Sequence, residues 1–215
     1  MTRPAVLFYC QHLLGVGHIS RSLAICRALL DRFDVTFVQG GPDIGRTIES
    51  PGFTHAFLPP LRMREEDSSL YDPEGKRSVE ALWAARHDAL APLLDRAYAA
   101  VVIELYPFGR NKFKPEILGL IAQARARNPA TRVYCSNRDI MVQKFDQAAR
   151  EAKIVRILRE HFDHVLVHSD PALIAMEETF AATPEIADMI HYTGYVTDGA
   201  APPPSDRSGI LVSLG

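Results

Sequence analysis

The chain has 215 residues, and 24 Lys and Arg against 26 Asp and Glu give it a formal net charge of −2. This balance argues against nucleic acid as the main partner, and a chain of this length can bury a sizeable core. No apolar run reaches the ~18 residues of a membrane span, and the N-terminus lacks a signal-peptide pattern, so we expect a cytoplasmic protein. The cysteines have no C-x-x-C spacing and are expected as reduced core thiols; they are Cys10, Cys26 and Cys135.

The first 30 residues predict a strand, a glycine turn and a helix. The apolar run 5–10 has the length of a buried parallel strand. Gly15 and Gly17 then allow a tight turn, and from His18 onward the apolar residues follow helical spacing. In open α/β folds such a turn lies at the carboxyl edge of the sheet, where ligands bind. His18 is therefore expected in the first helical turn, beside free backbone N–H groups.

This glycine turn departs from the known phosphate-binding motifs. Gly15-Val16-Gly17 matches the start of the dinucleotide fingerprint, but Ser20 stands in place of the third glycine. The next strand ends in Gln39 rather than in an acid that would bind a ribose, and no P-loop Lys follows the turn. We therefore interpret the turn as placing His18 where it can act on a ligand. The alternative is that His18 only begins the helix.

Strand-like and helix-like segments alternate along the rest of the chain. In chain order we expect a strand at 35–38, a short helix at 42–49, a strand at 54–58, a long loop at 62–76, a helix at 78–97, a strand at 100–105, a helix at 115–127, a strand at 132–135, a helix at 145–161, a strand at 163–168, a helix at 171–180 and a strand at 190–193. This alternation predicts an α/β domain over residues 1–197, a Rossmann-like open parallel sheet of about seven strands with helices on both faces.

The C-terminal residues carry separate information. Residues 198–209 are rich in Pro, Gly and Ser, as is typical of a linker between domains. Residues 210–215 are an apolar, strand-like run with nothing local to pair with. We interpret them as the first strand of a truncated second domain.

Polar side chains follow two strands of the predicted sheet. Glu104 ends an apolar strand, where a charge is costly unless it faces a ligand or a partner. It is expected to bind hydroxyls of a ligand or to orient His18, and a structural ion pair with Arg110 or Arg138 is the alternative. Asn137, Arg138 and Asp139 follow the next strand, and their planar side chains suit sugar binding as well as a capped turn.

Three further patterns have two interpretations each. His161, His164 and His168 resemble a zinc spacing, but a helix-to-strand change separates them, so no metal is expected. His168-Ser169-Asp170 has the letters of a catalytic triad, yet adjacent residues cannot adopt its geometry; Ser169-Asp170-Pro171 is expected to begin a helix instead. The loop 106–114 combines aromatic and basic side chains, which suits anionic lipid headgroups or a solvated loop with buried aromatics.

Together these motifs resemble the N-terminal domain of GT-B glycosyltransferases. The glycine turn, His18 and the run 20–24 are most similar to the branch of the bacterial lipid-intermediate N-acetylglucosaminyltransferase, the MurG-like branch. Further stretches resemble an uncharacterised group of predicted bacterial glycosyltransferases in that branch; they are 104–110, 136–140, 168–171, 177–180 and 192–196. Leu13-Leu14 depart from the pattern, since better-known relatives have more glycine there.

The resemblance implies two Rossmann-like domains, of which this chain is the acceptor-binding one. A nucleotide-sugar, expected to be a UDP-sugar, would bind mostly to the other domain and serve as co-substrate without a further cofactor. The reaction implied is a metal-independent, inverting transfer to a hydroxyl acceptor, with His18 as base and Glu104 beside it. The substrate-binding residues expected are Gly15, Gly17, Arg21, Arg110, Asn137, Arg138 and Asp139.

Several expectations about partners and alternatives follow from the same resemblance. The acceptor is unknown; a lipid-linked acceptor would bring peripheral contact with the inner membrane face. The fragment alone is expected to be inactive, because half of the cleft would be absent. Two other functions stay open: a sugar-nucleotide 2-epimerase of the same architecture, and a non-catalytic glycan- or nucleotide-binding module.

Overall fold

Seven parallel strands form the central sheet of this protein. The computed structural model describes residues 3–13, 16–64, 66–138, 140–141, 146–197 and 199. The strands are β1 (Ala5–Cys10), β2 (Asp34–Gln39), β3 (Phe53–Phe57), β6 (Ala100–Glu104), β7 (Arg132–Asn137), β8 (His164–Val167) and β9 (Ile190–Tyr192). Their order in the sheet is β3-β2-β1-β6-β7-β8-β9, and every pairing is parallel. The expected Rossmann-like α/β sheet is confirmed.

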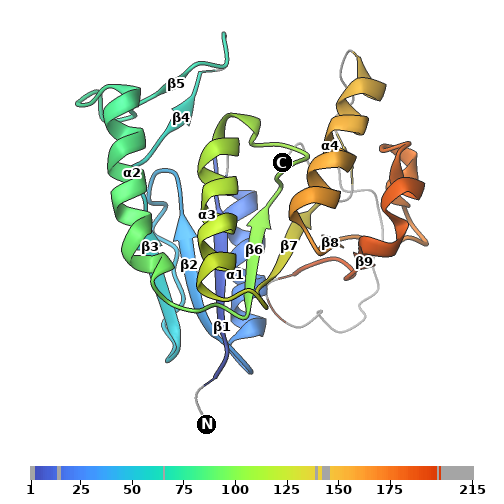
Figure 1. Cartoon of the computed structure of the whole chain (residues 1–215), viewed down its shortest axis with the longest axis horizontal. Coiled ribbons are helices and arrows are strands. Elements are labelled where there is room, and N and C mark those ends of the chain that lie inside the picture. The colour runs from blue at the N-terminus through green and yellow to red at the C-terminus, as the bar shows by residue number, and fades with distance from the viewer. Residues whose placement is uncertain are drawn as a thin grey trace, which may run out of the picture.

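Helices cover the sheet on both faces (Figure 1). Helix α1 (Gly17–Leu29) lies behind the sheet, and α2 (Val79–Leu94), α3 (Lys114–Arg127) and α4 (Gln147–His161) lie in front of it. Strand β1 is buried along its whole length because its side chains alternate between these two layers. The chain runs outward from β1 through β2 to β3, and then returns to β6 on the other side of β1. The topological switch point of the sheet therefore lies between β1 and β6.

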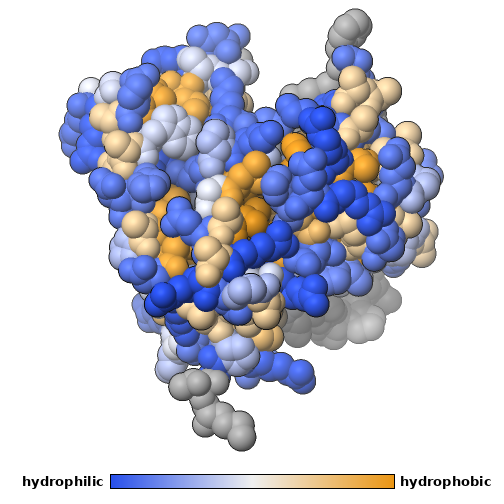
Figure 2. Space-filling view, viewed as in Figure 1, coloured by the Kyte–Doolittle hydropathy of each residue, from blue (hydrophilic) through white to orange (hydrophobic). Residues whose placement is uncertain are grey.

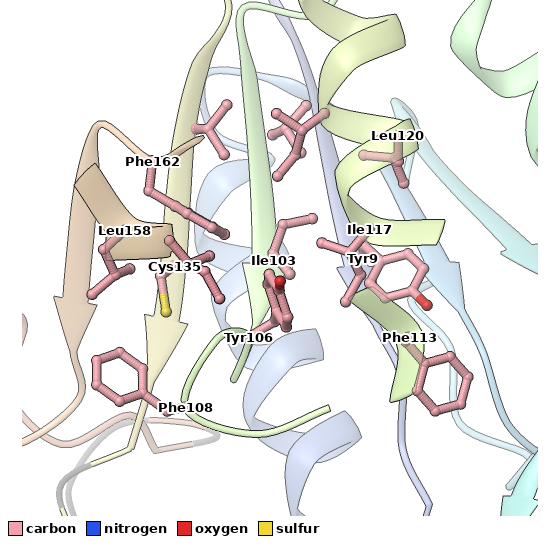
Figure 3. Close-up of a cluster of buried hydrophobic side chains, with 14 of the residues drawn as sticks. Tyr9, Ile103, Tyr106, Phe108, Phe113, Ile117, Leu120, Cys135, Leu158 and Phe162 are labelled. Carbon is pink, nitrogen blue, oxygen red and sulfur yellow. The ribbon is translucent and has the colours of Figure 1, made fainter. Parts of the chain in front are cut away.

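The core on the front face joins the strands to three helices. Figure 3 shows Tyr9, Ile103 and Cys135 of the central strands among side chains of α3 and α4. On the opposite face Ile19, Leu23 and Cys26 of α1 pack against strand residues that include Phe8 and Phe37. Each helix thus buries one apolar stripe, as its spacing predicts. The three cysteines are buried free thiols, as expected.

The helix expected at 42–49 is wrong. This segment has no helical assignment, and Gly45 has a left-handed backbone with φ of 67°. The Asp43 carboxylate accepts the Gly45 backbone N–H at 2.8 Å, and the Pro42 carbonyl accepts hydrogen bonds from His12 and Gln39. These local bonds replace the hydrogen bonds that a helix would make.

The helix expected at 171–180 is also wrong, and with it the helix start expected at Ser169-Asp170-Pro171. Asp170 instead closes a turn, since its carboxylate accepts the Ala172 backbone N–H at 2.9 Å. Only a 3₁₀ turn follows, η2 (Met176–Glu178), and a second one, η3 (Thr183–Met189), precedes β9. Met176 and Phe180 are buried, so the apolar residues of this stretch fill the core without forming an α-helix.

The segment expected as a long loop at 62–76 contains a short hairpin. Strands β4 (Arg62–Met63) and β5 (Leu70–Tyr71) pair antiparallel above α2, outside the main sheet. The guanidinium of Arg64, the residue after β4, lies 4.7 Å from the centre of the Tyr71 ring of β5. A 3₁₀ turn, η1 (Asn111–Phe113), leads into α3. Apart from Gly199, the predicted linker 198–209 and the strand 210–215 lie outside the described residues.

Candidate functional site

Two side chains that flank the switch point meet at the carboxyl edge of the sheet. His18 is the second residue of α1, which follows β1, and Glu104 is the last residue of β6. The His18 Nδ1 atom lies 2.6 Å from Glu104 Oε1. Glu104 is fully buried, whereas the His18 side chain keeps 20% of its exposure. The sequence placed both residues at this edge, and the structure brings them into contact.

The same carboxylate oxygen also binds an arginine. Arg21 stands three residues after His18 on α1, and its Nη2 lies 2.9 Å from Glu104 Oε1. Two donors on one helix face therefore share one acceptor. The other oxygen, Oε2, has no hydrogen-bond partner among the described residues, and Arg110 Nη2 lies 4.0 Å from it, at the limit of an ion pair. Pairing with His18 and Arg21 compensates for the burial of this charge.

This arrangement determines what His18 can do chemically. A carboxylate only accepts hydrogen bonds, so the contact with Glu104 assigns the imidazole proton to Nδ1. The Nε2 atom then carries a free lone pair and can accept a proton from a ligand hydroxyl. The ion pair with Arg138 considered from the sequence is wrong, because Arg138 Nε donates to the Ile140 carbonyl instead.

The loop after β6 holds a second arginine near this carboxylate. Leu105 and Arg110 have left-handed backbones, with φ of 63° and 59°, which are uncommon for non-glycine residues. Arg110 Nε donates to the Gln11 carbonyl at 2.5 Å, which ties this loop to the segment after β1. Tyr106 and Phe108 point into the core, as the buried-aromatic interpretation of the loop predicts (Figure 3).

A histidine that was not assigned a site role lies at the same edge. His168 follows β8, and its two ring nitrogens contact Ser136 Oγ at 2.8 Å and Thr193 Oγ1 at 2.7 Å. Burial, with a smaller contribution from the positive charge of Arg21, lowers the pKa of His168 to about 4, so the ring is neutral at pH 7. Ser136 and Glu104 are register partners in β7 and β6, which places them on one face of the sheet.

The other predicted site residues divide into three groups. Asn137 follows Ser136 and so faces the opposite side of the sheet, where its Nδ2 lies 3.4 Å from Met141 Sδ; it does not join Glu104. Gly17 begins α1, and a Cβ added to it would meet no atom within 4 Å, so space does not require glycine there. Gly15 and Asp139 lie outside the described residues.

The histidines with zinc-like spacing have separate partners. His161 lies 3.6 Å from the Glu160 carboxylate, whereas His164 shares a short contact of 2.9 Å with His191. In the described part of the chain, no three His, Cys, Asp or Glu side chains gather as metal ligands would. No helix within the described ranges is both long and apolar enough to cross a bilayer.

An apolar hollow lies away from His18. A cavity of about 470 Å³ opens between α2 and α3, and Figure 2 shows hydrophobic surface gathered there. Its lining includes Trp83, Leu90 and Leu120 but neither His18 nor Glu104. Glu116 also borders it, but its carboxylate is already bound by Arg86 and Tyr9. The candidate site is therefore the polar edge around Glu104.

Comparison with known proteins supports the fold. No family model matches the sequence, and no curated protein matches it. Among solved structures, the chain is similar to Phytolacca americana UGT2 complexed with UDP-2fluoro-glucose and pterostilbene, with a TM-score of 0.54 at 13% identity over 93% of this chain and 56% of that one. It is also similar to a UDP-glucosyltransferase from Polygonum tinctorium, with a TM-score of 0.52 at 14% identity over 92% of this chain and 54% of that one. The chain thus spans a little over half the length of these enzymes.

Proposed function

We propose that this chain is the acceptor-binding part of a glycosyltransferase that moves a sugar from a nucleotide-sugar to a hydroxyl. The observation that carries the proposal is the 2.6 Å contact between His18 and the buried Glu104 at the switch point of the sheet. A UDP-sugar is the donor favoured, because one structurally similar enzyme is described with UDP-2fluoro-glucose and another is named a UDP-glucosyltransferase. The narrower assignment to the MurG-like branch stays a prediction.

In the proposed reaction, His18 acts as the general base. The acceptor hydroxyl oxygen attacks the anomeric carbon of the donor sugar while its proton moves to His18 Nε2. The bond between that carbon and the diphosphate oxygen breaks, and the nucleoside diphosphate leaves with the electron pair. Glu104 holds the ring through Nδ1 and stabilises the imidazolium that forms, in the way that a buried carboxylate supports a catalytic histidine. Because one oxygen serves both His18 and Arg21, the carboxylate is held in one orientation.

The experiment measures UDP release by the natural polypeptide that contains this chain, with UDP-glucose and UDP-N-acetylglucosamine as donors and a panel of hydroxyl acceptors. We expect His18→Ala to lower turnover by about 10²–10⁴-fold, and Glu104→Gln to lower it as well. His87→Ala is the matched control, since His87 is an exposed histidine on α2. Turnover that survives His18→Ala would contradict the proposal.

Two other functions give different results in the same experiment. A 2-epimerase would interconvert the sugar of the donor without an acceptor, and it needs further carboxylates to handle the elimination of UDP. Among the described residues at this edge, Glu104 is the one buried carboxylate near His18, which favours transfer. A binding module would retain acceptor affinity and release no UDP.

A further inference from the structure

Positive charge exceeds negative charge around Glu104. Arg21 of α1 and Arg110 of the loop after β6 approach this one carboxylate to 2.9 and 4.0 Å. A third arginine, Arg62 of β4, lies near enough to His12, beside the same edge, for its charge to act on that ring. Arg21 and Arg110 keep only 21% and 12% of their side-chain exposure, so water screens their charges little. One carboxylate leaves two guanidinium charges uncompensated within the described part of the site.

Hydrogen bonds of Gln11 link it to Arg110 and to Leu61, the residue before Arg62. The Gln11 carbonyl accepts the Arg110 Nε, and the Gln11 side chain donates to the Leu61 carbonyl at 3.4 Å. Arg62 directly follows Leu61, so its backbone lies near Gln11, the residue that binds Arg110, and its charge acts on the neighbouring His12. The adjacent His12 does not balance them: burial lowers its pKa, and the positive charges of Arg110 and Arg62 lower it further.

Both arginines have donors to spare. Arg62 makes no hydrogen bond and no ion pair with any described residue, although it is only partly exposed. Arg110 uses Nε for Gln11, and its Nη2 is 4.0 Å from Glu104 Oε2, beyond hydrogen-bond distance. Glu104 Oε2 and Arg21 Nε are themselves buried without hydrogen-bond partners in the part of the chain that is described. Buried polar atoms without partners are rare in native proteins and indicate a missing ligand or water.

The unpaired hydrogen-bonding groups at this site indicate the chemical class of the ligand that they bind. Planar guanidinium groups bind oxyanions through two parallel hydrogen bonds, and a buried excess of positive charge favours an anion. The unpartnered oxygen of Glu104, in contrast, accepts a hydrogen bond from a hydroxyl. We propose that the acceptor of the transfer reaction is an anionic polyhydroxy compound, whose carboxylate or phosphate binds Arg62 and Arg110 while a hydroxyl lies at Glu104 and His18. The identification of this ligand as the acceptor rests on the proposed function, whereas the oxyanion site does not.

The test compares three probes that share one hexose skeleton. Glucose, glucuronate and glucose 6-phosphate are titrated into the 215-residue chain by calorimetry at low ionic strength, without a nucleotide-sugar. We expect one or both charged probes to bind at least tenfold more tightly than glucose, and the stronger of the two identifies the oxyanion. Equal binding of all three, or binding of none, would overturn the proposal.

Variants of the β4–β5 hairpin locate the site. Arg62→Gln should weaken the charged probes at least tenfold, and Arg62→Lys should restore part of the affinity. The matched control is Arg64→Gln, which removes the same charge two residues away, where the guanidinium lies over Tyr71. Affinity that is unchanged by Arg62→Gln, or lowered equally by Arg64→Gln, would contradict the assignment.

Competition with UDP distinguishes a binding site for the acceptor from one for the donor. If UDP displaces the probes and its own binding is lost in Arg62→Gln, the arginines hold the donor diphosphate and the proposal is wrong. His18→Ala should lower the affinity for the charged probes less than Arg62→Gln does, because it removes a contact with the hydroxyl and not with the oxyanion. A protein that binds them but turns over normally without His18 would refute the proposed transfer mechanism while leaving the oxyanion site intact.

Discussion

Arg86 forms a buried ion pair with Glu116, and its replacement tests how much this pair stabilises the fold. It lies in the middle of α2 and is fully buried. Its guanidinium donates to both carboxylate oxygens of Glu116, at 2.8 and 2.7 Å, and to the carbonyl of Pro59 and the side chain of Gln11. Arg86→Met keeps an unbranched chain of similar length but leaves the buried Glu116 carboxylate with only the Tyr9 hydroxyl as donor.

Breaking one side of a buried ion pair costs about 3–5 kcal/mol, because the remaining charge stays in a medium that solvates it poorly. Arg86→Met is therefore expected to lower the free energy of unfolding by that amount. Replacing both residues, Arg86→Met with Glu116→Met, removes the unpaired charge and should recover most of the loss. The double variant also keeps the test valid if the single variant fails to fold.

The assay is urea unfolding followed by far-ultraviolet circular dichroism and by fluorescence of the single tryptophan, Trp83. Arg96→Met serves as the control, since Arg96 forms a half-exposed ion pair with Asp34 and should cost less than about 1 kcal/mol. A loss below about 1 kcal/mol in Arg86→Met, or a double variant no more stable than the single one, would refute this reasoning.

Three other properties can be measured in the same chain. The pKa of His168 is about 4 in the folded protein and 6.5 ordinarily, so the unfolded chain binds this proton at a higher pH than the folded one. The free energy of unfolding should therefore fall by about 3 kcal/mol as the pH drops from 6.5 to 4. His168→Gln should remove this part of the pH dependence of stability. The buried thiols, whose pKa values burial raises, should resist a thiol reagent at pH 8 until urea exposes them, and fast labelling of the native protein would contradict their burial; they are Cys10, Cys26 and Cys135. Ser78→Ala should cost about 1 kcal/mol in urea unfolding, because the Ser78 hydroxyl accepts the Ala81 backbone N–H, and an unchanged midpoint would argue against this cap.

The central elements were predictable because their signals are continuous. Strand β1 is an apolar run, β6 is apolar up to its last residue, Glu104, and α1 and α3 bury residues at helical spacing. The two helices predicted wrongly begin near Asp43 and Asp170, whose side chains bind the backbone two residues ahead and favour turns. Sequence spacing does not reveal which of these competing local bonds will form.

The site was predictable only one strand at a time. His18 and Glu104 were each expected at the carboxyl edge because each follows a recognisable strand. The network of His168 was missed, since its partners Ser136 and Thr193 lie 32 and 25 residues away and meet it through strand order. The adjacent letters His168-Ser169-Asp170 directed attention to neighbours in sequence, which the structure does not bring together as a triad.

The contact between His18 and Glu104 at the switch point of the sheet also has a consequence for folding. His18 and Glu104 are 86 residues apart, and they meet only when β6 has docked against β1. Closing so long a loop costs chain entropy before the contact can stabilise the fold, so strands that are far apart in the sequence pair slowly. A chain with only β1, α1, β2 and β3 assembled would present His18 without its carboxylate. The environment of the His18 ring, followed by NMR during refolding, therefore reports when the two halves of the sheet have joined.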